Sequence, residues 1–506
     1  MTADAAEVKD LVRYIHHFIL LMTAFISFVS LPATAQTSRT FYIDYASGSN
    51  ANNGTISAPW KSHPYMQSDA GCTGTGSAPA YSHQAGDHFI FKGGVTWPAA
   101  CFQLSVTSGG SSAASDYYGV DLTWSSGASF TRPVFDMANN TPAGYSFIKA
   151  RAQYIVFDNL ELKRMKIVSG VGECNDANMD LGTAASGYIT VKNMYIHDWT
   201  ITTLVSGSTS HGSGAICQNG ASGPINVDTV TMDDAATTAP VPFGACFRNL
   251  GEIKNSDCEH TGEGEVGLFG PIHDNTFANI NGNAVAKYDS VNHTNILEIG
   301  AGETVAIYNN VIHDNSSGVT IYVCGKGSIY NNVFWRNYNQ FIKLSGQPGG
   351  VCGSNTSSDV MNVYNNTADC SNGSNCFGTD AKGTLAGTVN LENNHWITNG
   401  AAVCVGTSNC SAIATFNQAN NVTMSTSTAT SEGYTTLNWY IPTSSSGGTV
   451  GRALDLANLC SGGLGALCSD RLHAARLTSW DVGAYEFGSQ TTSKPNPPGN
   501  LNAIVQ

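Results

Sequence analysis

The chain has 506 residues, of which only 12% are charged, and its formal net charge is −14. This acidic balance argues against a nucleic-acid partner, because phosphate binding requires a basic surface. The 54 glycines are typical of a turn-rich β protein, and the length allows one long repeat domain or two to three ordinary domains.

An apolar run near the N-terminus has the features of a secretory signal. Residues 18–31 form the run, and Ala33-Thr34-Ala35 follows it as an A-x-A cleavage motif. The run has 14 residues, whereas a membrane span needs about 20. We therefore expect cleavage after Ala35 and a secreted protein, extracellular or periplasmic, without a membrane partner.

A short strand phrase recurs through the middle of the chain. Residues 307–314 read IYNNVIHD and residues 329–336 read IYNNVFWR, 22 residues later. Alternating, β-branched and aromatic residues indicate a strand. The last apolar position of each copy is Leu162, Ile196, Met232, Cys258, Phe277, Ile312, Phe334, Ala368 and Trp396. A fixed phrase at a variable spacing of 19 to 36 residues predicts one coil per repeat of a β-solenoid.

Asparagine pairs recur at one place in four copies. They are Asn309-Asn310, Asn331-Asn332, Asn365-Asn366 and Asn393-Asn394. In stacked coils, an Asn can hydrogen-bond to its copies above and below and so form a ladder. The alternative is that the pairs only mark turns. The flanking apolar residues are in register too, which favours the ladder.

The repeat pattern resembles the right-handed parallel β-helix superfamily, the pectate-lyase-like proteins. Residues 41–44, FYID, resemble the first strand of secreted members, and residues 481–487, DVGAYEF, resemble the closing strand of bacterial members. The resemblance implies an all-β fold: a right-handed parallel β-helix that forms a single elongated domain. It is weak for the reaction, because this superfold hosts lyases, hydrolases, epimerases and phage adhesins.

Four segments are expected along the chain. Residues 1–35 are the signal peptide, residues 36–150 the N-terminal cap and first coils, and residues 151–488 the parallel β-helix. Residues 489–506 are expected to be a Pro-rich linker and the start of a further, missing module. We expect a monomer.

Fourteen cysteines indicate a disulfide-stapled exported chain. Five neighbouring pairs stand out: Cys246 and Cys258, Cys324 and Cys352, Cys370 and Cys376, Cys404 and Cys410, and Cys460 and Cys468. We expect local disulfides that pin loops, although spacing does not fix connectivity and Cys258 is alternatively a core residue. The sequence lacks a CxxC pair, which disfavours a zinc ribbon.

A polar pair follows the last apolar position in most copies. The pairs include Lys163-Arg164, His197-Asp198, Asp233-Asp234, Glu259-His260 and His313-Asp314. Because adjacent coils stack ~4.8 Å apart, these pairs are expected to form one ridge along the outside of the solenoid. A long polysaccharide on this ridge would contact several coils. The alternative is a row of solvated strand ends.

Residues 228–303 concentrate acids and histidines with only three bases, Arg248, Lys254 and Lys287. The acids and histidines include Asp228, Asp233, Asp234, Asp257, Glu259, His260, Glu263, Glu265, His273, Asp274, Asp289, His293 and Glu298. Crowded like charges destabilise a fold unless they bind a cation, pair with a base or hold a proton. A functional site is therefore favoured over a solvated acidic face.

The expected function, which rests mainly on the superfamily, is a Ca²⁺-assisted polysaccharide lyase that cleaves a uronate-containing glycan by β-elimination. A lyase needs a cation to withdraw charge from the carboxylate, and a base. Asp233, Asp234 and Glu259 are the candidate Ca²⁺ ligands, because Ca²⁺ prefers oxygen ligands. Lys287 or Arg248 is the candidate base.

Two alternatives remain open at this stage. A glycoside hydrolase of the same fold needs two carboxyls, ~5–5.5 Å apart for retention or ~6.5–9.5 Å for inversion. Asp233 or Asp234 with Glu259 would lie one coil apart, which fits the shorter distance. The third hypothesis is a non-catalytic, glycan-binding adhesin. If Asp233, Asp234 and Glu259 lie in one groove with His260 and Lys287, an enzyme is favoured. If these side chains lie on separate faces of the solenoid, the adhesin is favoured.

Residues 287–298 form a second candidate segment. It is similar to a His-x-x-x-Ile/Leu-x-Glu/Gln strand of many β-helix enzymes. His293 is a candidate general acid or ligand, because its charge changes near neutral pH, and its alternative is a hydrogen-bonded corner residue. His260 and Glu259 are the other catalytic candidates. The substrate-binding candidates are Asp289, Glu298 and Glu263.

Overall fold

The computed structural model describes most of the chain from residue 38 to residue 488. The described residues are 38–74, 76–168, 174–201, 213–235, 244–268, 270–281, 295–299, 304–316, 318–345, 356–372, 375–379, 385–400, 403–404 and 410–488. From Arg39 on they belong to one compact unit. The expected signal peptide (1–35), the linker (489–506), Lys287, Asp289 and His293 lie outside them. In the described part, no helix is long and apolar enough to cross a membrane.

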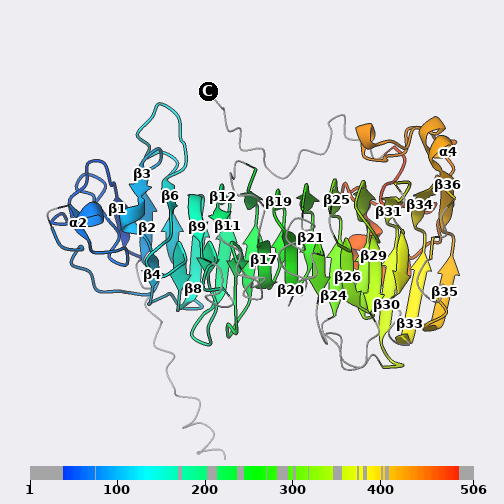
Figure 1. The fold of residues 1–506 in the computed structure, drawn as a ribbon, viewed down its shortest axis with the longest axis horizontal. Coiled ribbons are helices and arrows are strands. Elements are labelled where there is room, and N and C mark those ends of the chain that lie inside the picture. The colour runs from blue at the N-terminus through cyan, green and yellow to red at the C-terminus, as the bar shows by residue number, and fades with distance from the viewer. Residues whose placement is uncertain are drawn as a thin grey trace, which may run out of the picture. The chain divides into compact units, whose positions relative to one another are not determined.

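The described chain winds through three parallel sheets (Figure 1), and successive coils add one strand to each sheet. Sheet 1 consists, in stacking order, of β1 (Thr40–Ile43), β2 (His88–Phe91), β5 (Asp116–Gly119), β8 (Gln153–Asp158), β11 (Gly187–Lys192), β15 (Ile225–Asp228), β18 (Ile253–Lys254), β21 (Ile272–His273), β24 (Val305–Tyr308), β27 (Gly327–Tyr330), β30 (Val360–Tyr364), β33 (Leu385–Glu392) and β35 (Ile413–Ala419).

Sheet 2 carries the strand in which the repeated phrase ends. It consists of β3 (Thr96–Pro98), β6 (Val134–Asn140), β9 (Glu161–Ile167), β12 (Tyr195–His197), β16 (Thr231–Asp233), β19 (Asp257–Glu259), β22 (Thr276–Ala278), β25 (Val311–His313), β28 (Val333–Trp335), β31 (Thr367–Asp369), β34 (His395–Thr398) and β36 (Val422–Ser425), with β13 (Thr200–Ile201) paired to β9.

Sheet 3 completes each coil. It consists of β4 (Leu104–Val106), β7 (Ile148–Ala150), β10 (Met179–Asp180), β14 (Ile216–Cys217), β17 (Ala245–Leu250), β20 (Glu263–Leu268), β23 (Leu297–Ile299), β26 (Ile321–Cys324), β29 (Ile342–Ser345) and β32 (Phe377–Thr379). The helices of the described chain are short: α2 (Ala70–Thr73), η1 (Ala99–Cys101), α4 (Thr426–Ser431), η2 (Thr436–Asn438), α5 (Ala457–Cys460) and η3 (Gly465–Cys468). The predicted parallel β-solenoid is confirmed.

The register of sheet 2 confirms the repeat alignment made from the sequence. The nine last apolar positions, from Leu162 to Trp396, pair with one another strand by strand. All nine side chains are buried and belong to one core cluster. Because side chains alternate across a strand, this inward column fixes which residues of sheet 2 face outward.

The paired asparagines serve both of the roles considered for them. The second Asn of each pair belongs to a buried ladder in which each Nδ2 donates to the next Oδ1 at 3.0 Å: Asn275, Asn310, Asn332, Asn366, Asn394 and Asn421. The first Asn of each pair has a left-handed backbone, with φ between 49° and 59°, and turns the chain from sheet 1 into sheet 2. Asn tolerates this conformation better than most residues.

Removal of one Asn from the middle of the ladder is expected to destabilise the fold. In Asn332→Ala, the backbone N–H of Asn310 loses its acceptor and the carbonyl of Ile307 loses its donor, inside the solenoid. Unpaired buried groups of this kind lower the free energy of unfolding by about 2–4 kcal/mol in total. Urea denaturation measures the change.

The control for this variant is Asn417→Ala. Asn417 also donates to an Asn of the neighbouring coil, at 2.9 Å to Asn390, but its side chain is exposed. We expect a change within about 0.5 kcal/mol. Equal losses in the two variants would contradict a special role for the buried ladder.

Residues 426–487, which we call the C-terminal cover, pack against the outside of the last coils. The prediction that residues 481–487 form a closing strand is wrong, because this segment lies across outward side chains instead of along a strand edge. The backbone N–H of Ala484 donates to Thr367 Oγ1 (3.0 Å), and that of Gly483 donates to the carbonyl of Asn393 (2.8 Å). Tyr485 is buried in this contact.

Six disulfides lie within the described residues: Cys72–Cys101, Cys174–Cys217, Cys246–Cys258, Cys370–Cys376, Cys404–Cys410 and Cys460–Cys468. Four of them are neighbouring pairs predicted from the sequence, and Cys258 is both disulfide-bonded and part of the core. Cys324 is disulfide-bonded as well, and Cys352 lies outside the described residues. Such a set of disulfides is typical of an oxidising, extracytoplasmic compartment.

Candidate functional site

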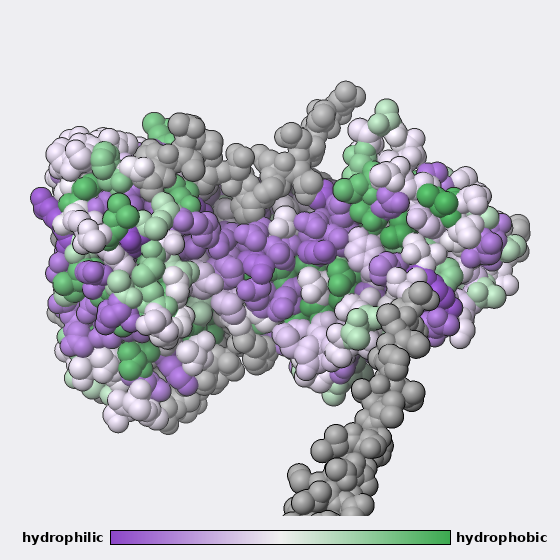
Figure 2. Space-filling view, turned by 180° about the vertical axis from the view of Figure 1, so that it is seen from behind, coloured by the Kyte–Doolittle hydropathy of each residue, from purple (hydrophilic) through white to green (hydrophobic). Residues whose placement is uncertain are grey.

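The polar ridge predicted from the sequence lies on the outer face of sheet 2. We call it the outer row, and it consists of Lys163, His197, Asp233, Glu259, Ala278, His313 and Trp335, paired in register on successive strands. On the side opposite to Figure 1, hydrophilic side chains gather over the middle of the surface (Figure 2). The register of sheet 2 places the polar members of the outer row on one face of several coils.

Asp233, Glu259 and His260 come together in the middle of the outer row. Asp233 in β16 pairs in register with Glu259 in β19, so the two residues are one coil, ~4.8 Å, apart. His260 Nδ1 lies 2.8 Å from Asp233 Oδ1 and 3.9 Å from Glu259 Oε2. The exposed fractions of these side chains are 28% for Asp233, 32% for Glu259 and 37% for His260. A ligand can therefore reach both carboxyls.

The environments of the two carboxyls move their pKa values in opposite directions. Burial and the charge of Asp233 raise the pKa of Glu259. Burial also opposes ionisation of Asp233, but the hydrogen bonds from His260 and from the backbone of Ala235 outweigh it and lower the pKa of Asp233. The hydrogen bond to Asp233 in turn raises the pKa of His260. The pair thus combines a carboxyl whose pKa is raised with one whose pKa is lowered.

Two buried carboxyls adjoin this pair. Asp234 is 2% exposed, and burial with the nearby charges of Asp198 and Asp233 raises its pKa to about 9. Asp257 is 7% exposed, and burial with the charge of Glu259 raises its pKa to about 7. In the described part of the chain, the Oδ1 atom of each has no hydrogen-bond partner. Asp257 faces outward, because it precedes Glu259 by two residues on β19.

A second histidine cluster lies on the preceding coils. His197 Nδ1 is 2.9 Å from Asp198 Oδ2, and its Nε2 is 3.2 Å from Glu161 Oε1. The Tyr195 ring stacks on His197 with centroids 4.0 Å apart. Glu161, Tyr195 and Asp257 are not among the site residues predicted from the sequence. Their position two residues before the outer row, on the same face of each strand, is the signal that identifies them.

The other predicted site residues that the structure describes, Arg248, Glu263 and Glu298, lie in sheet 3. Arg248 is in β17 and Glu298 in β23, and both pair in register with Val266 of β20. Glu263 begins β20 and is buried. Asn295 Nδ2 donates to Glu298 Oε2 at 2.6 Å. These residues are separated from the outer row because they belong to a different sheet of the same coils.

The predicted calcium ligands do not form a metal-type group. Within the described ranges, no three or more His, Cys, Asp or Glu side chains have the arrangement of a metal site. Asp233 is hydrogen-bonded to His260, and Asp234 is buried behind it. The calcium site therefore stays a prediction from the sequence, and no step below depends on it.

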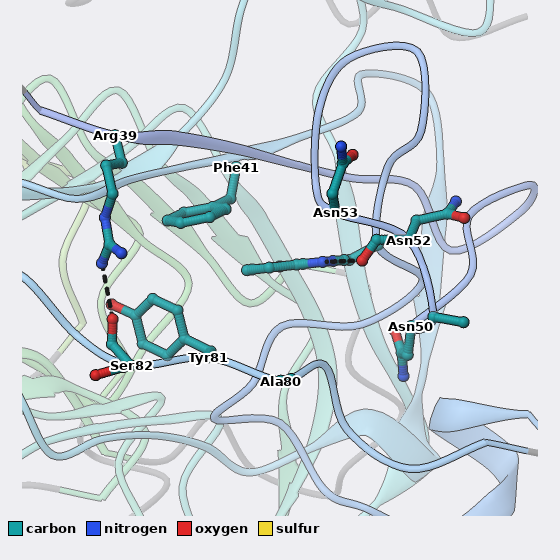
Figure 3. A pocket seen from close by; sticks show the side chains of 10 residues that line it. Arg39, Phe41, Asn50, Asn52, Asn53, Ala80, Tyr81 and Ser82 are labelled. Atoms are coloured by element: carbon teal, nitrogen blue, oxygen red, sulfur yellow. Dashed lines mark hydrogen bonds between the residues drawn. The ribbon is translucent and has the colours of Figure 1, made fainter.

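A hollow of about 400 Å³ lies in the N-terminal cap (Figure 3). The stacked rings of Phe41 and Trp60 line it, together with Arg39. Its polar groups bond within the cap: Arg39 pairs with Asp87, and Trp60 Nε1 donates to the carbonyl of Asn52 at 2.9 Å. We therefore assign this hollow to the packing of the cap.

Comparison with known proteins gives distant structural similarity only. No family model and no curated protein matches the chain. A solved GH136 lacto-N-biosidase from Eubacterium ramulus is similar with a TM-score of 0.42 and 12% identity, over 76% of this chain and 68% of that one. A rhamnogalacturonan lyase is similar with a TM-score of 0.36 and 14% identity, over 76% and 87% of the two chains. With its coils stacked strand on strand in three parallel sheets, the chain is a parallel β-helix protein.

Proposed function

We propose that the chain is a secreted glycoside hydrolase whose active site is the carboxyl pair Asp233 and Glu259. The observation that carries this proposal is the placement of the two carboxyls on neighbouring coils with pKa values moved apart. Glycoside hydrolysis needs one protonated and one ionised carboxyl on the two sides of the scissile bond. The polysaccharide substrate lies along the outer row.

The spacing of the pair supports a retaining reaction. A separation of one coil, ~4.8 Å, is close to the ~5–5.5 Å of retaining enzymes. Glu259 donates its proton to the glycosidic oxygen while Asp233 attacks the anomeric carbon. The glycosidic bond breaks and a glycosyl ester forms on Asp233. Glu259 then takes a proton from water, which attacks the same carbon and releases the sugar and Asp233.

His260 keeps Asp233 ready for this role. Its Nδ1–H donates to Asp233 Oδ1 at 2.8 Å, which orients the carboxylate and stabilises its ionised form. Glu259 has a weaker, 3.9 Å contact with the same nitrogen. The asymmetry of these two contacts supports the assignment of Asp233 as nucleophile and Glu259 as proton donor.

Calcium-assisted β-elimination, the reaction expected from the sequence, needs a base beside a cation. Arg248 lies in sheet 3, away from the outer row, and Lys287 lies outside the described residues. The described residues near Glu259 thus supply carboxyls and histidines, which suit hydrolysis better than elimination.

Product analysis tests the proposal directly. The mature protein is incubated with pectic, alginate-like and neutral polysaccharides, with Ca²⁺ and with a chelator. We expect new reducing ends both with Ca²⁺ and with the chelator. We expect no ultraviolet absorbance from unsaturated uronates in either condition. Absorbance that requires Ca²⁺ would establish the lyase instead. Glycan binding without either product would support the adhesin.

A further inference from the structure

The His197 cluster, which consists of Glu161, His197 and Asp198, lies beside the carboxyl pair on the outer face of sheet 2. His197 in β12 pairs in register with Asp233 in β16, so the cluster begins one coil, ~4.8 Å, from the proposed nucleophile. The exposed fractions of the side chains are 20% for Glu161, 12% for His197 and 25% for Asp198. One coil is similar in length to one sugar unit. The cluster therefore lies where a glycan along the outer row would place the unit next to the one that Asp233 attacks.

The cluster presents hydrogen-bond acceptors to solvent. Both ring nitrogens of His197 are engaged, Nδ1 with Asp198 Oδ2 at 2.9 Å and Nε2 with Glu161 Oε1 at 3.2 Å. Within the described residues, the remaining carboxylate oxygens, Asp198 Oδ1 and Glu161 Oε2, have no hydrogen-bond partner and are not buried. An ionised carboxylate only accepts hydrogen bonds, and sugar hydroxyls donate them. The two open oxygens therefore match the hydroxyls of a sugar.

The cations that flank the outer row on these coils already face carboxylates. Lys163 Nζ lies 3.7 Å from Glu161 Oε1. The Arg164 guanidinium donates to both carboxylate oxygens of Asp136. A uronate carboxylate bound here would have to compete with these carboxylates for its counter-charge.

Two further cations lie beside the cluster but not in the outer row. Arg132 donates from Nε and Nη2 to the carbonyl of Asn193, at 3.2 and 3.1 Å. Lys166 lies beyond the bend that the left-handed backbone of Arg164 makes, where it pairs in register with Thr200 of β13. In the part of the chain that the structure describes, the cluster therefore offers an incoming carboxylate no unpaired cation.

The charges around the carboxyl pair oppose the addition of another anion. Burial and the charges of Asp198 and Asp233 raise the pKa of Asp234, and burial and the charge of Asp233 raise the pKa of Glu259. A uronate on this face would add one more negative charge to the same group. Like charges at short distance repel, most strongly where water is partly excluded. The face thus disfavours a uronate and accepts a sugar that carries only hydroxyls.

We propose that the substrate is an uncharged glycan, and that the His197 cluster binds the hydroxyls of the sugar unit next to the scissile bond. This inference rests on the proposed function and names the substrate class of the same site. It differs from the uronate-containing glycan expected from the superfamily. Glu161 and Asp198 act as specificity residues, because they accept hydrogen bonds from a neutral unit and repel the carboxylate of a uronate.

The test compares polymers that share a backbone and differ only in charge. A glucan, a mannan and a galactan are each used in their neutral form and after oxidation of part of their C6 hydroxyls to carboxylates. Release of reducing ends gives kcat/KM for both forms, and we expect the value to be about tenfold or more higher for the neutral form at low salt. The preference should shrink at about 1 M NaCl, because salt screens charge repulsion.

The other outcomes separate this inference from the proposed function. Equal kcat/KM for the two forms, or a higher value for the carboxylated form, would overturn the neutral substrate class and leave the proposed hydrolase intact. Release of new reducing ends from pectic or alginate-like polymers alone, without ultraviolet absorbance, would do the same. No new reducing ends from any of these polymers would overturn both.

A variant of the cluster provides a second readout. Glu161→Gln removes one negative charge, keeps an oxygen acceptor and frees Lys163 to pair with a uronate carboxylate. We expect the kcat/KM preference for the neutral form to fall severalfold, whereas general damage to the fold would lower both values together. Glu392→Gln, which removes a charge from sheet 1, is the matched control with an unchanged preference. A wild-type preference in Glu161→Gln would overturn the role of the cluster.

Discussion

Glu259→Gln is expected to lower kcat for glycan cleavage by about 10²–10⁴-fold, because the amide cannot donate the proton that the leaving oxygen needs. Steady-state release of reducing ends measures this loss. Glu392→Gln is the matched control, since Glu392 ends β33 in sheet 1, several coils from the site. We expect the control to retain wild-type turnover. A Glu259→Gln protein with unchanged kcat would remove Glu259 from the mechanism.

The partner variant separates the two roles within the pair. Asp233→Asn removes the proposed nucleophile and is expected to lose turnover to a similar extent. A small external anion such as azide can replace a missing carboxylate nucleophile, so azide should restore turnover in Asp233→Asn. With a substrate whose leaving group needs no proton, azide can restore turnover in both variants, and the configuration of the glycosyl azide separates the two roles. We expect the inverted azide from Asp233→Asn and the retained azide from Glu259→Gln, and the opposite result would reverse the assignment of acid and nucleophile.

Asp234→Asn is expected to raise the free energy of unfolding by ~2–4 kcal/mol at pH 7. In the folded protein the pKa of Asp234 is about 9, against a usual value of 3.8. Folding at neutral pH therefore requires this carboxyl to take up a proton. Asn has almost the same shape and needs no proton, so the variant avoids the cost.

The sign of the pH dependence makes this prediction specific. Below pH ~4 the carboxyl is protonated in both the folded and the unfolded chain, and the advantage of Asp234→Asn should be smallest. As the pH rises from 4 towards 9, the wild-type protein progressively loses stability relative to the variant. Urea unfolding at pH 4 and at pH 8 tests this trend. An equal difference at both values would show that the effect does not arise from ionisation.

A buried acid that destabilises the fold indicates a functional reason for its position. Asp234 adjoins Asp233, and its neutral carboxyl leaves Asp233 as the ionised group at neutral pH. Strongly shifted pKa values cluster at catalytic sites, and stability is commonly lost there. The expected stabilisation of Asp234→Asn should therefore come with reduced activity.

The sequence by itself determined the solenoid and its register. Side chains in a strand alternate with a period of two, and the last apolar residue of the repeated phrase stands at the same position in every copy. The inward column from Leu162 to Trp396 follows from these two facts, and so does the outward placement of Asp233 beside Glu259. The Asn ladder was predictable for the same reason, because one fixed phrase brings equivalent residues into contact in every coil.

Only the tertiary structure decided which sheet holds each residue outside the repeated phrase, which carboxyls are buried, and what covers the last coils. Arg248 and Glu298 lie in sheet 3 because loops of variable length assign residues to one sheet or another, and the repeat does not fix those lengths. The burial of Asp234 and Asp257, and the pKa values that result, depend on packing between coils. The C-terminal cover packs against the last coils through contacts between residues more than a hundred positions apart, such as Ala484 and Thr367, and no local pattern encodes such contacts.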